Sequence, residues 1–304
     1  MMVSIQEKCK DVNKKFIYYI LASDNSKTYF SLMSAGSGVQ NLNREVVSKL
    51  PIPLPPLYEQ KAIAKVLSDV DELITSIDKL IEKKQKIKQG TMQLLLTGKK
   101  RLPGFTGEWE VKLLGEVASI TMGQSPSSEY YNFEFIGVPL IQGNADIVKR
   151  KTIKRVFTTQ ITKTCNAEDI IMTVRAQVGK VGKALFNACI GRGVCAISYT
   201  NDYLYYYLIS IEEGWAKLSK GSTFDSVNSS DIKELEVYMP KSIEEQKAIA
   251  KILSDMYSEI EAIQQKLEKY KLIKEGMMEK LLTGKVRLNE SSRPNRANHP
   301  KQSS

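Results

Sequence analysis

The feature that most constrains how this chain can fold is an internal duplication. The sequence EQKAIAK at 59–65 recurs at 245–251, and LLTGK at 95–99 recurs at 281–285, both with an offset of 186 residues. Of the 44 paired positions that begin at the two glutamates, 25 are identical. Chance does not give this agreement, so the duplication indicates one structural unit that is used twice.

Both copies of the duplicated block have the pattern of a long helix. Their apolar residues alternate between spacings of three and four, as in the seam of a coiled coil. We therefore expect helices over 57–97 and 243–283, each about 60 Å long at roughly 1.5 Å per residue. Gly98 and Gly284 suit the C-caps of these helices. The residues predicted to pair the two helices are Ile63, Leu67, Val70, Ile74, Ile77, Ile81, Ile249, Leu253, Met256, Ile260, Ile263 and Leu267.

The sequence between the two helices has a different character. Glycines and polar turns separate short apolar or β-branched runs, and one aromatic helix is expected at 203–211. This mixture predicts an α+β fold, with a mixed α/β module over 103–240. The runs lie at 117–122, 138–141, 169–174, 194–199 and 234–239.

The N-terminal stretch repeats only the end of that module. With the observed offset, Met1 corresponds to about residue 187, so the first copy lacks the counterpart of 103–186. A fragment of this size rarely forms a core alone. The predicted organisation is a partial module at 1–56, a first long helix at 57–102, a complete module at 103–240, a second long helix at 241–288 and a disordered tail at 289–304.

The partial module is expected to lie near Leu281, at the end of the second helix. Its apolar side chains are expected to lack the partners that the missing counterpart would supply, and therefore to be exposed or mobile. These side chains are Phe16, Ile17, Tyr18, Ile20 and Leu21.

The composition speaks against catalysis by this chain. The only histidine, His299, lies in the polar tail, which leaves the rest without a histidine base or a histidine metal ligand. The four cysteines form no C-x-x-C pair and are expected to be free thiols. No phosphate-binding loop, dinucleotide motif or Asn-Pro-Pro-aromatic methyltransferase motif is present. No apolar run reaches the roughly 18 residues of a membrane helix, and we expect a cytoplasmic protein.

Charge placement points to an acidic partner. The net charge is +10, yet 103–240 carries 14 basic and 15 acidic residues. Against that balance, five of the seven residues at 149–155 are basic, which favours contact with DNA phosphates over a solvated loop. The amides of Gln142 and Asn144 are able to read adenine in a major groove, and glycine-bearing loops that follow the buried runs allow the backbone to come close to a ligand. The candidate DNA-binding residues are Ser125, Gln142, Asn144, Lys149, Arg150, Lys151, Lys154, Arg155, Arg175, Gln177, Lys180, Lys183, Ser222 and Thr223.

Several motifs together resemble the specificity subunits of Type I restriction-modification systems. They are WEVKLLGE at 109–116, PLIQGN at 139–144, DIIMTVRA at 169–176 followed by a glycine loop, the proline-rich stretch 51–56, and EQKAIAK and LLTGK in both helices. The resemblance covers nearly all of 16–288 and is specific as a set.

The resemblance implies two target-recognition domains separated by two long antiparallel helices, with each domain reading one half of a split DNA site. It also implies methyltransferase subunits docked on the helices, and restriction subunits joined through them. Double-stranded DNA is the expected ligand. No cofactor is expected on this chain, because S-adenosylmethionine, ATP and Mg²⁺ belong to the partner subunits. The short first domain departs from the family pattern.

Other functions are compatible with the same residues. The chain could be a coiled-coil assembly protein that binds no DNA, or an inactive or recombination-cassette fragment of a specificity subunit. A methyltransferase fused to a recognition module is a third alternative. The absence of the Asn-Pro-Pro-aromatic methyltransferase motif argues against it.

Overall fold

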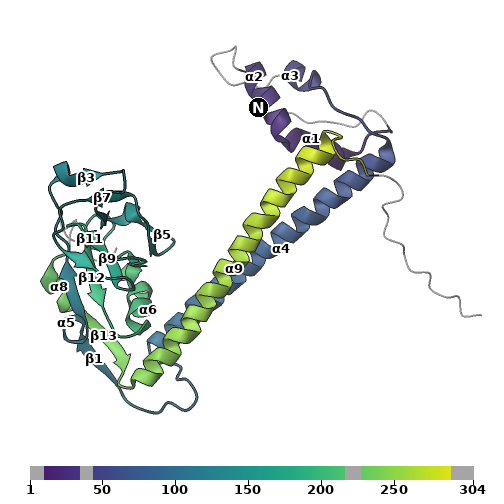
Figure 1. The fold of residues 1–304 in the computed structure, drawn as a ribbon. Helices are drawn as coiled ribbons and strands as arrows, with labels where there is room; N and C mark the ends of the chain where they lie inside the picture. Colours follow the sequence, from purple (N-terminus) through teal and green to yellow (C-terminus); the bar gives the residue numbers. More distant parts are fainter. Residues whose placement is uncertain (1–9, 35–43, 216–226, 289–304) are drawn as a thin grey trace, which may run out of the picture. The chain divides into compact units, whose positions relative to one another are not determined.

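The structure is a computed structural model that describes residues 10–34, 44–215 and 227–288. The chain divides into a larger unit, Lys84–Glu259, and a smaller unit formed by the residues up to Lys83 and from Ile260 onward. Helices α4 (Leu57–Leu96) and α9 (Ile243–Leu282) contribute residues to both units (Figure 1). Each has 40 residues and lies where the apolar periodicity predicts a helix.

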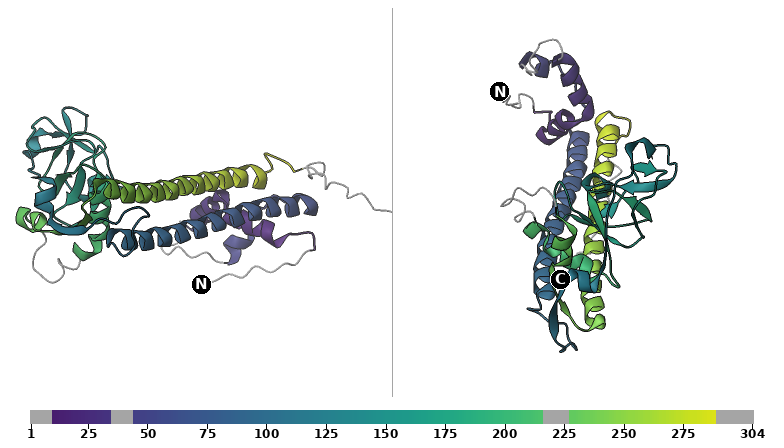
Figure 2. Two further views of the ribbon diagram at one scale, coloured as in Figure 1. Left: turned by 90° about the horizontal axis from the view of Figure 1, so that it is seen from below. Right: turned by 90° about the vertical axis from the view of Figure 1, so that its left-hand side faces the viewer.

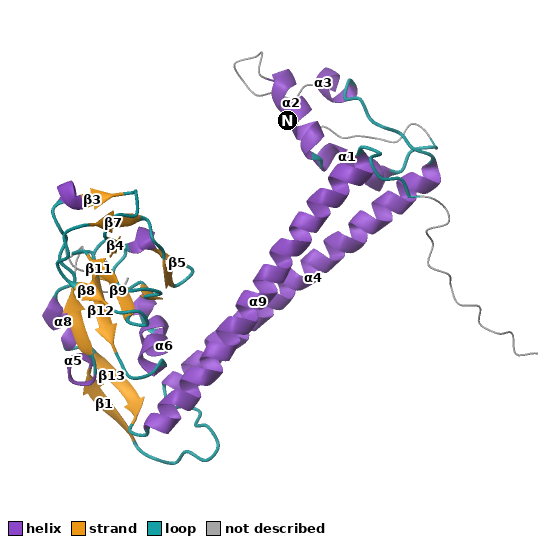
Figure 3. Ribbon diagram, viewed as in Figure 1, coloured by secondary structure: helices purple, strands orange, loops and turns teal. Residues whose placement is uncertain are grey.

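The fold is mixed α/β, and the described residues of the larger unit form three sheets (Figure 3). A two-stranded sheet pairs β1 (Trp109–Leu113) with β13 (Glu236–Pro240). The order in the six-stranded sheet is β2 (Ser119–Met122), β12 (Val194–Ser198), β9 (Ile170–Thr173), β10 (Val181–Lys183), β6 (Lys151–Thr152) and β5 (Ile147–Val148). The order in the five-stranded sheet is β3 (Tyr131–Asn132), β7 (Val156–Thr158), β4 (Val138–Ile141), β11 (Ala188–Ile190) and β8 (Thr164–Cys165).

Strand β9 connects the two main cores of the larger unit, because it is buried on both faces. Ile170 and Met172 face a core that includes helix α6 (Tyr203–Ser210), whereas Ile171 faces a core shared with the five-stranded sheet. Strand β12 alternates in the same way. The continuous apolar runs at 169–174 and 194–199 therefore do correspond to buried strands, as predicted.

The prediction for 117–122 is partly wrong. Strand β2 begins at Ser119, and the chain before it forms the short helix α5 (Leu114–Val117). The Glu116 carboxylate accepts a hydrogen bond from the backbone N–H of Leu113 at 3.2 Å, which supports the first turn of α5. The helix α8 (Ser229–Lys233) and the 3-10 turns η1 (Ser128–Tyr130) and η2 (Asn144–Asp146) complete the larger unit.

Both long helices end in the predicted glycine C-cap. Gly98 and Gly284 have φ angles of 67° and 73°, in the left-handed region that glycine adopts at low cost. The next turn is closed by hydrogen bonds from Lys100 N–H to the Leu94 carbonyl at 3.0 Å and from Val286 N–H to the Lys280 carbonyl at 3.1 Å. Because the two ends match, the duplicated sequence folds in the same way in both copies.

Helices α4 and α9 lie side by side and contact each other within each unit (Figures 1 and 2). In the smaller unit, Ile77 and Ile81 pack with Leu267, and Ile74, Ile263 and Tyr270 flank them. The predicted residue Ile81 is buried, whereas its neighbour Leu80 is 41% exposed. The other predicted pairing residues lie in different environments. Ile63 and Leu67 join the core around helix α1 (Lys14–Ala22), and Ile249, Leu253 and Met256 join that of the larger unit. Ile260 is buried, and Val70 is half-buried.

The smaller unit contains α1 (Lys14–Ala22), α2 (Asp24–Ser34) and α3 (Arg44–Ser48). Helix α1 packs beside Leu281, as expected. The expectation that its apolar face lacks partners is wrong for Phe16 and Ile20, which are buried because α4 and α9 themselves cover them. On the opposite face of α1, Tyr18 is 62% exposed.

An ion pair fixes the first turn of α4 in the smaller unit. The buried Glu59 carboxylate accepts hydrogen bonds from Arg287 Nε at 2.8 Å and Nη2 at 2.7 Å, and one from the Leu288 backbone N–H at 3.2 Å. The hydrogen bonds from Arg287 lower the pKa of Glu59, although burial alone would raise it.

We expect Glu59→Gln to destabilise the protein by about 2 kcal/mol at pH 7, because two charge-assisted hydrogen bonds are weakened. Since the folded-state pKa of Glu59 is depressed, its stabilisation is complete above the ordinary glutamate value of about 4.3 and is lost as the pH falls through the folded-state pKa. The difference in the free energy of unfolding between the wild type and Glu59→Gln, measured in urea, should therefore become smaller from pH 7 to pH 3. A difference that stays constant over this range would contradict the assignment.

Candidate nucleic-acid interface

Four loops of the larger unit meet at one edge, which we call the loop edge. They are 123–127 after β2, 142–146 after β4, 175–180 between β9 and β10, and 191–193 between β11 and β12. Short-range bonds join them: the Arg192 backbone N–H donates to Ser125 Oγ at 3.1 Å, and Asn144 Nδ2 donates to Gln177 Oε1 at 2.8 Å. The sequence-predicted residues Ser125, Gln142, Asn144, Arg175, Gln177 and Lys180 therefore come together here.

Glycines allow these loops to approach closely. A Cβ atom built on Gly193 would lie 2.1 Å from the Gln142 carbonyl oxygen, and one built on Gly123 would lie 2.1 Å from the Gly191 carbonyl oxygen. Neither backbone oxygen can move aside as a flexible side chain could. The glycines at 123 and 193 are thus required by the packing of loop against loop, and the edge is a rigid surface.

The side chain of Asp146, which is only 3% exposed, holds the loop 142–146 in place. Its Oδ2 accepts hydrogen bonds from the backbone N–H groups of Gln142 at 2.8 Å and Gly143 at 3.1 Å. Arg155 Nε lies 3.2 Å from the other carboxylate oxygen. Arg155 therefore compensates a buried carboxylate while half of its side chain stays exposed, and its contact with DNA stays a prediction.

The loop 175–180 is held in a conformation that exposes its polar side chains. Ala176 and Gln177 have positive φ angles of 38° and 63°, which cost free energy for residues other than glycine. The Thr173 hydroxyl stabilises the turn, because it donates to the Gln177 carbonyl at 2.7 Å and accepts from the Lys180 backbone N–H at 2.9 Å. The result is a fixed loop with Arg175 and Gln177 exposed.

The loop edge presents positive charge and amides. Arg175 and Arg192 are exposed, and the only acidic residue of the four loops is the buried Asp146. Arg192 was not among the residues predicted from the sequence. Its signal was the tripeptide Gly191-Arg192-Gly193, in which a cation sits between two glycines directly after a buried strand.

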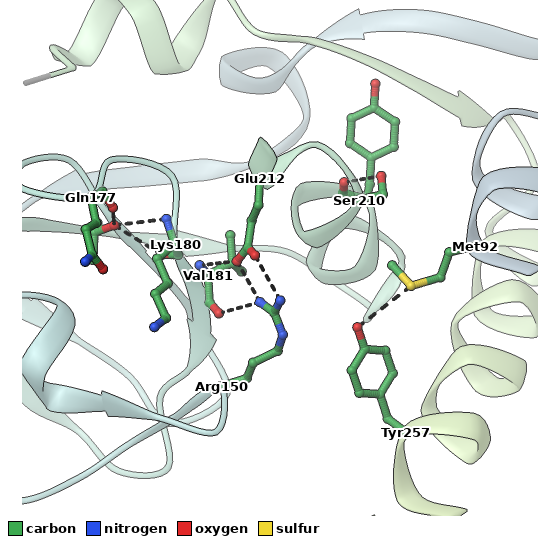
Figure 4. Close-up of polar contacts among 10 residues, drawn as sticks. Met92, Arg150, Gln177, Lys180, Val181, Ser210, Glu212 and Tyr257 are labelled. Carbon is green, nitrogen blue, oxygen red and sulfur yellow. Dashed lines mark hydrogen bonds and ion pairs between the residues drawn. The ribbon is translucent and has the colours of Figure 1, made fainter. Parts of the chain in front are cut away.

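The basic cluster at 149–155 divides: Lys149, Lys151, Lys154 and Arg155 are exposed, whereas Arg150 is engaged within the larger unit. Lys149 and Arg150 have φ angles of 47° and 63° in the turn between β5 and β6. Arg150 donates to both oxygens of Glu212, at 2.6 and 2.9 Å, and to the Val181 carbonyl at 3.1 Å (Figure 4). Burial alone would lower the pKa of Arg150, but the hydrogen bonds to Glu212 raise it overall. Arg150 therefore has a structural role in the larger unit, and its contact with DNA stays a prediction.

Other candidate residues also have partners within the unit. Lys183 forms ion pairs with Glu168 and Asp202, and Lys154 lies over the Phe186 ring at 5.0 Å. Lys149 and Lys151 are exposed in the β5–β6 turn and on β6. Ser222 and Thr223 lie outside the described residues.

The cysteines of the larger unit are part of its core. Cys165, Cys189 and Cys195 are buried and free, and burial raises the pKa of Cys165 to about 11. The Cys165 thiol is thus protonated at neutral pH and poorly reactive. Within the described residues, no helix is both long enough and apolar enough to span a bilayer.

With this geometry established, the chain can be compared with known proteins. The family model of the Type I restriction modification DNA specificity domain matches residues 1–89 and 106–271. The match includes most of both long helices and all four loops of the loop edge, and it defines a module for DNA sequence recognition. The chain belongs to this family.

Individual relatives agree with the family. The chain is 37% identical to the protein designated the type I restriction enzyme MjaX specificity subunit of Methanocaldococcus jannaschii, over 90% of this chain and 68% of that protein. The solved HsdS subunit of Thermoanaerobacter tengcongensis is 26% identical, with a TM-score of 0.53 over 91% of this chain and 72% of that one. The Type I restriction-modification S subunit of M. genitalium, 20% identical, shares the fold with a TM-score of 0.64 over 90% and 73%.

Proposed function

We propose that this chain is the sequence-reading subunit of a Type I restriction-modification complex, and that its module 103–240 reads one half of a split DNA site. The observation that carries the proposal is the rigid loop edge, which offers Arg175 and Arg192 for phosphates and amides for base edges. Within the four loops, two exposed arginines stand against one buried carboxylate, that of Asp146, and this balance favours a polyanionic ligand. The exposed Glu129 lies just outside the loops, where Ser127 Oγ donates to it at 2.9 Å.

We further propose that α4 and α9 form an antiparallel spacer that sets the distance between two half-sites and docks methyltransferase subunits. Restriction subunits would join through the methyltransferase subunits, and S-adenosylmethionine, ATP and Mg²⁺ would be bound by those partners. The chain itself would be non-catalytic. The packing of early α4 residues such as Ile63 with late α9 residues such as Leu281 supports the antiparallel arrangement.

The smaller unit, including 1–56, is proposed to be the end of a second recognition domain. Matched contacts at the repeat offset support this. Arg287 holds Glu59 as Arg101 holds Glu245. Two further contacts are similar in both copies, with one partner shifted by a residue from the offset of 186. The Tyr19–Ser68 bond resembles Tyr206–Ser254, whose tyrosines are 187 residues apart. Gln60 donates to the Pro55 carbonyl and Gln246 to the Pro240 carbonyl, both at 2.8 Å, and these prolines are 185 residues apart.

The test is to sequence methylation sites in DNA from cells that express the methyltransferase subunits with and without this chain. We expect a split sequence that is methylated only when the chain is present. If no sequence depends on the chain, the proposal fails. The alternative that the chain is an assembly protein is tested by titrating DNA, at several salt concentrations, into the methyltransferase subunits with and without this chain. If the chain binds no DNA, the two preparations should have the same DNA affinity.

A further inference from the structure

We propose that Gln177 reads a base through its side-chain N–H groups, and that Asn144 positions it to select guanine over adenine at one position of the target. The inference rests on the proposed function and assigns a base preference within the same site. It replaces the sequence-based expectation that Asn144 itself reads adenine.

The hydrogen bond from Asn144 holds the oxygen of the Gln177 amide toward loop 142–146. Asn144 Nδ2 donates to Gln177 Oε1 at 2.8 Å, between residues 33 apart in the sequence, and uses one of the two lone pairs of that oxygen. An amide that reads adenine must place its nitrogen at N7 and its oxygen at the N6 amino group, side by side against one base edge. Because the oxygen of Gln177 is held against Asn144, the two N–H donors are the groups left to face a base. The matching base edge is that of guanine, whose N7 and O6 are both acceptors.

The burial of Asn144 fixes which way the pair is oriented. Its Oδ1 is buried and has no hydrogen-bond partner in the described part of the chain. If the Asn144 amide were reversed, the buried group would be an NH₂ with two unsatisfied donors in place of one carbonyl oxygen, which costs more. The nitrogen of Asn144 therefore faces Gln177, and Gln177 directs its own nitrogen outward.

Both residues are held in place from the backbone. Gln177 has a φ of 63°, and its carbonyl accepts from the Thr173 hydroxyl at 2.7 Å. Asn144 begins the η2 turn, whose preceding N–H groups are held by the buried Asp146. A reader whose backbone is fixed in advance loses little conformational entropy on binding, and this favours base discrimination. Arg175, two residues before Gln177, is exposed and available for a neighbouring phosphate.

The experiment compares Gln177→Glu and Asn144→Asp in the complex with methyltransferase subunits, read out by methylation-site sequencing. Gln177→Glu replaces two donors with acceptors, so we expect roughly 5- to 150-fold loss of guanine preference at one position in favour of cytosine, whose N4 is a donor. Asn144→Asp can only accept a hydrogen bond, so it should turn the Gln177 nitrogen inward, expose Oε1 and relax the preference at that same position.

Asn166→Asp, at an exposed position before β9 and thus at the opposite end of that strand from loop 175–180, makes the same charge change and should leave the recognised sequence unchanged. If the wild-type complex shows no sequence preference, the proposed function itself fails. If the wild type is specific but both variants melt normally and recognise the unchanged sequence, Gln177 is not a base reader. Equal loss of binding to all sequences by Gln177→Glu would likewise overturn the inference.

Discussion

The double substitution Arg175→Glu and Arg192→Glu is expected to weaken DNA binding by the complex at least about 100-fold near physiological salt. Each arginine is exposed at the loop edge, and each reversal removes a cation and adds a charge that repels phosphate. Because every bound phosphate releases counterions, the slope of log K against log salt should become shallower by about 0.9 for each phosphate that the variant no longer binds, or nearly two in all.

The matched control is Lys61→Glu with Lys247→Glu. These lysines are exposed, occupy equivalent repeat positions on α4 and α9, and give the same change in net charge. Mobility-shift titrations of both double variants at several salt concentrations distinguish a local interface from general electrostatic attraction. Equal weakening in the two variants would mean that the loop edge is not the DNA-binding surface.

The long helices could be predicted from the sequence because their signals are local. Apolar spacing, a glycine C-cap and the duplicated motif all lie within one continuous segment, and the observed ends at Leu96 and Leu282 lie one residue from the predicted ones. The buried strands β9 and β12 were predictable for a similar reason, since a strand covered on both faces is a continuous apolar run.

The short strands could not be predicted in this way. Strands β5, β6 and β8 have two residues each. Such strands have no periodicity of their own, because two residues cannot display an alternating pattern. Strands β6 and β8 form because β10 and β11 offer edges to pair with, and β5 then pairs with its neighbour β6.

Whether each basic side chain is bound within the unit or available to a ligand also depends on residues that are distant in the sequence. Arg150 and Lys149 are adjacent in the sequence and looked equivalent, but Glu212, 62 residues from Arg150, binds the Arg150 guanidinium. Arg155 likewise has a buried carboxylate to compensate. A run of basic residues therefore predicted charge but not its availability. In contrast, Arg175 and Gln177 could be singled out because they directly follow a buried strand that must end at an edge.

The substitution Arg101→Met is expected to destabilise the larger unit by about 3 kcal/mol, because it leaves the Glu245 carboxylate buried without a counterion. Glu245 is 1% exposed, whereas Arg101 is 30% exposed, so the charge left behind is the inaccessible one. Arg101 Nε and Nη2 each bind one Glu245 oxygen at 2.7 Å, and Nη2 also donates to the Gly107 carbonyl at 2.8 Å. The guanidinium further lies 5.6 Å from the Trp109 ring centre, a contact that methionine replaces only in part.

The control for Arg101→Met is Lys241→Met, which removes an ion pair with Glu108 in the same unit. Both partners of that pair are more than half exposed, at 51% and 81%, so we expect a change below about 1 kcal/mol. Urea unfolding of the two variants at pH 7 gives the comparison. Repeating the measurement in a Glu245→Gln background tests the mechanism: no carboxylate is then left to be buried, so the deficit caused by Arg101→Met should shrink. A deficit that is equal in both backgrounds would show that Arg101 acts through packing on Trp109 rather than by compensating the buried charge.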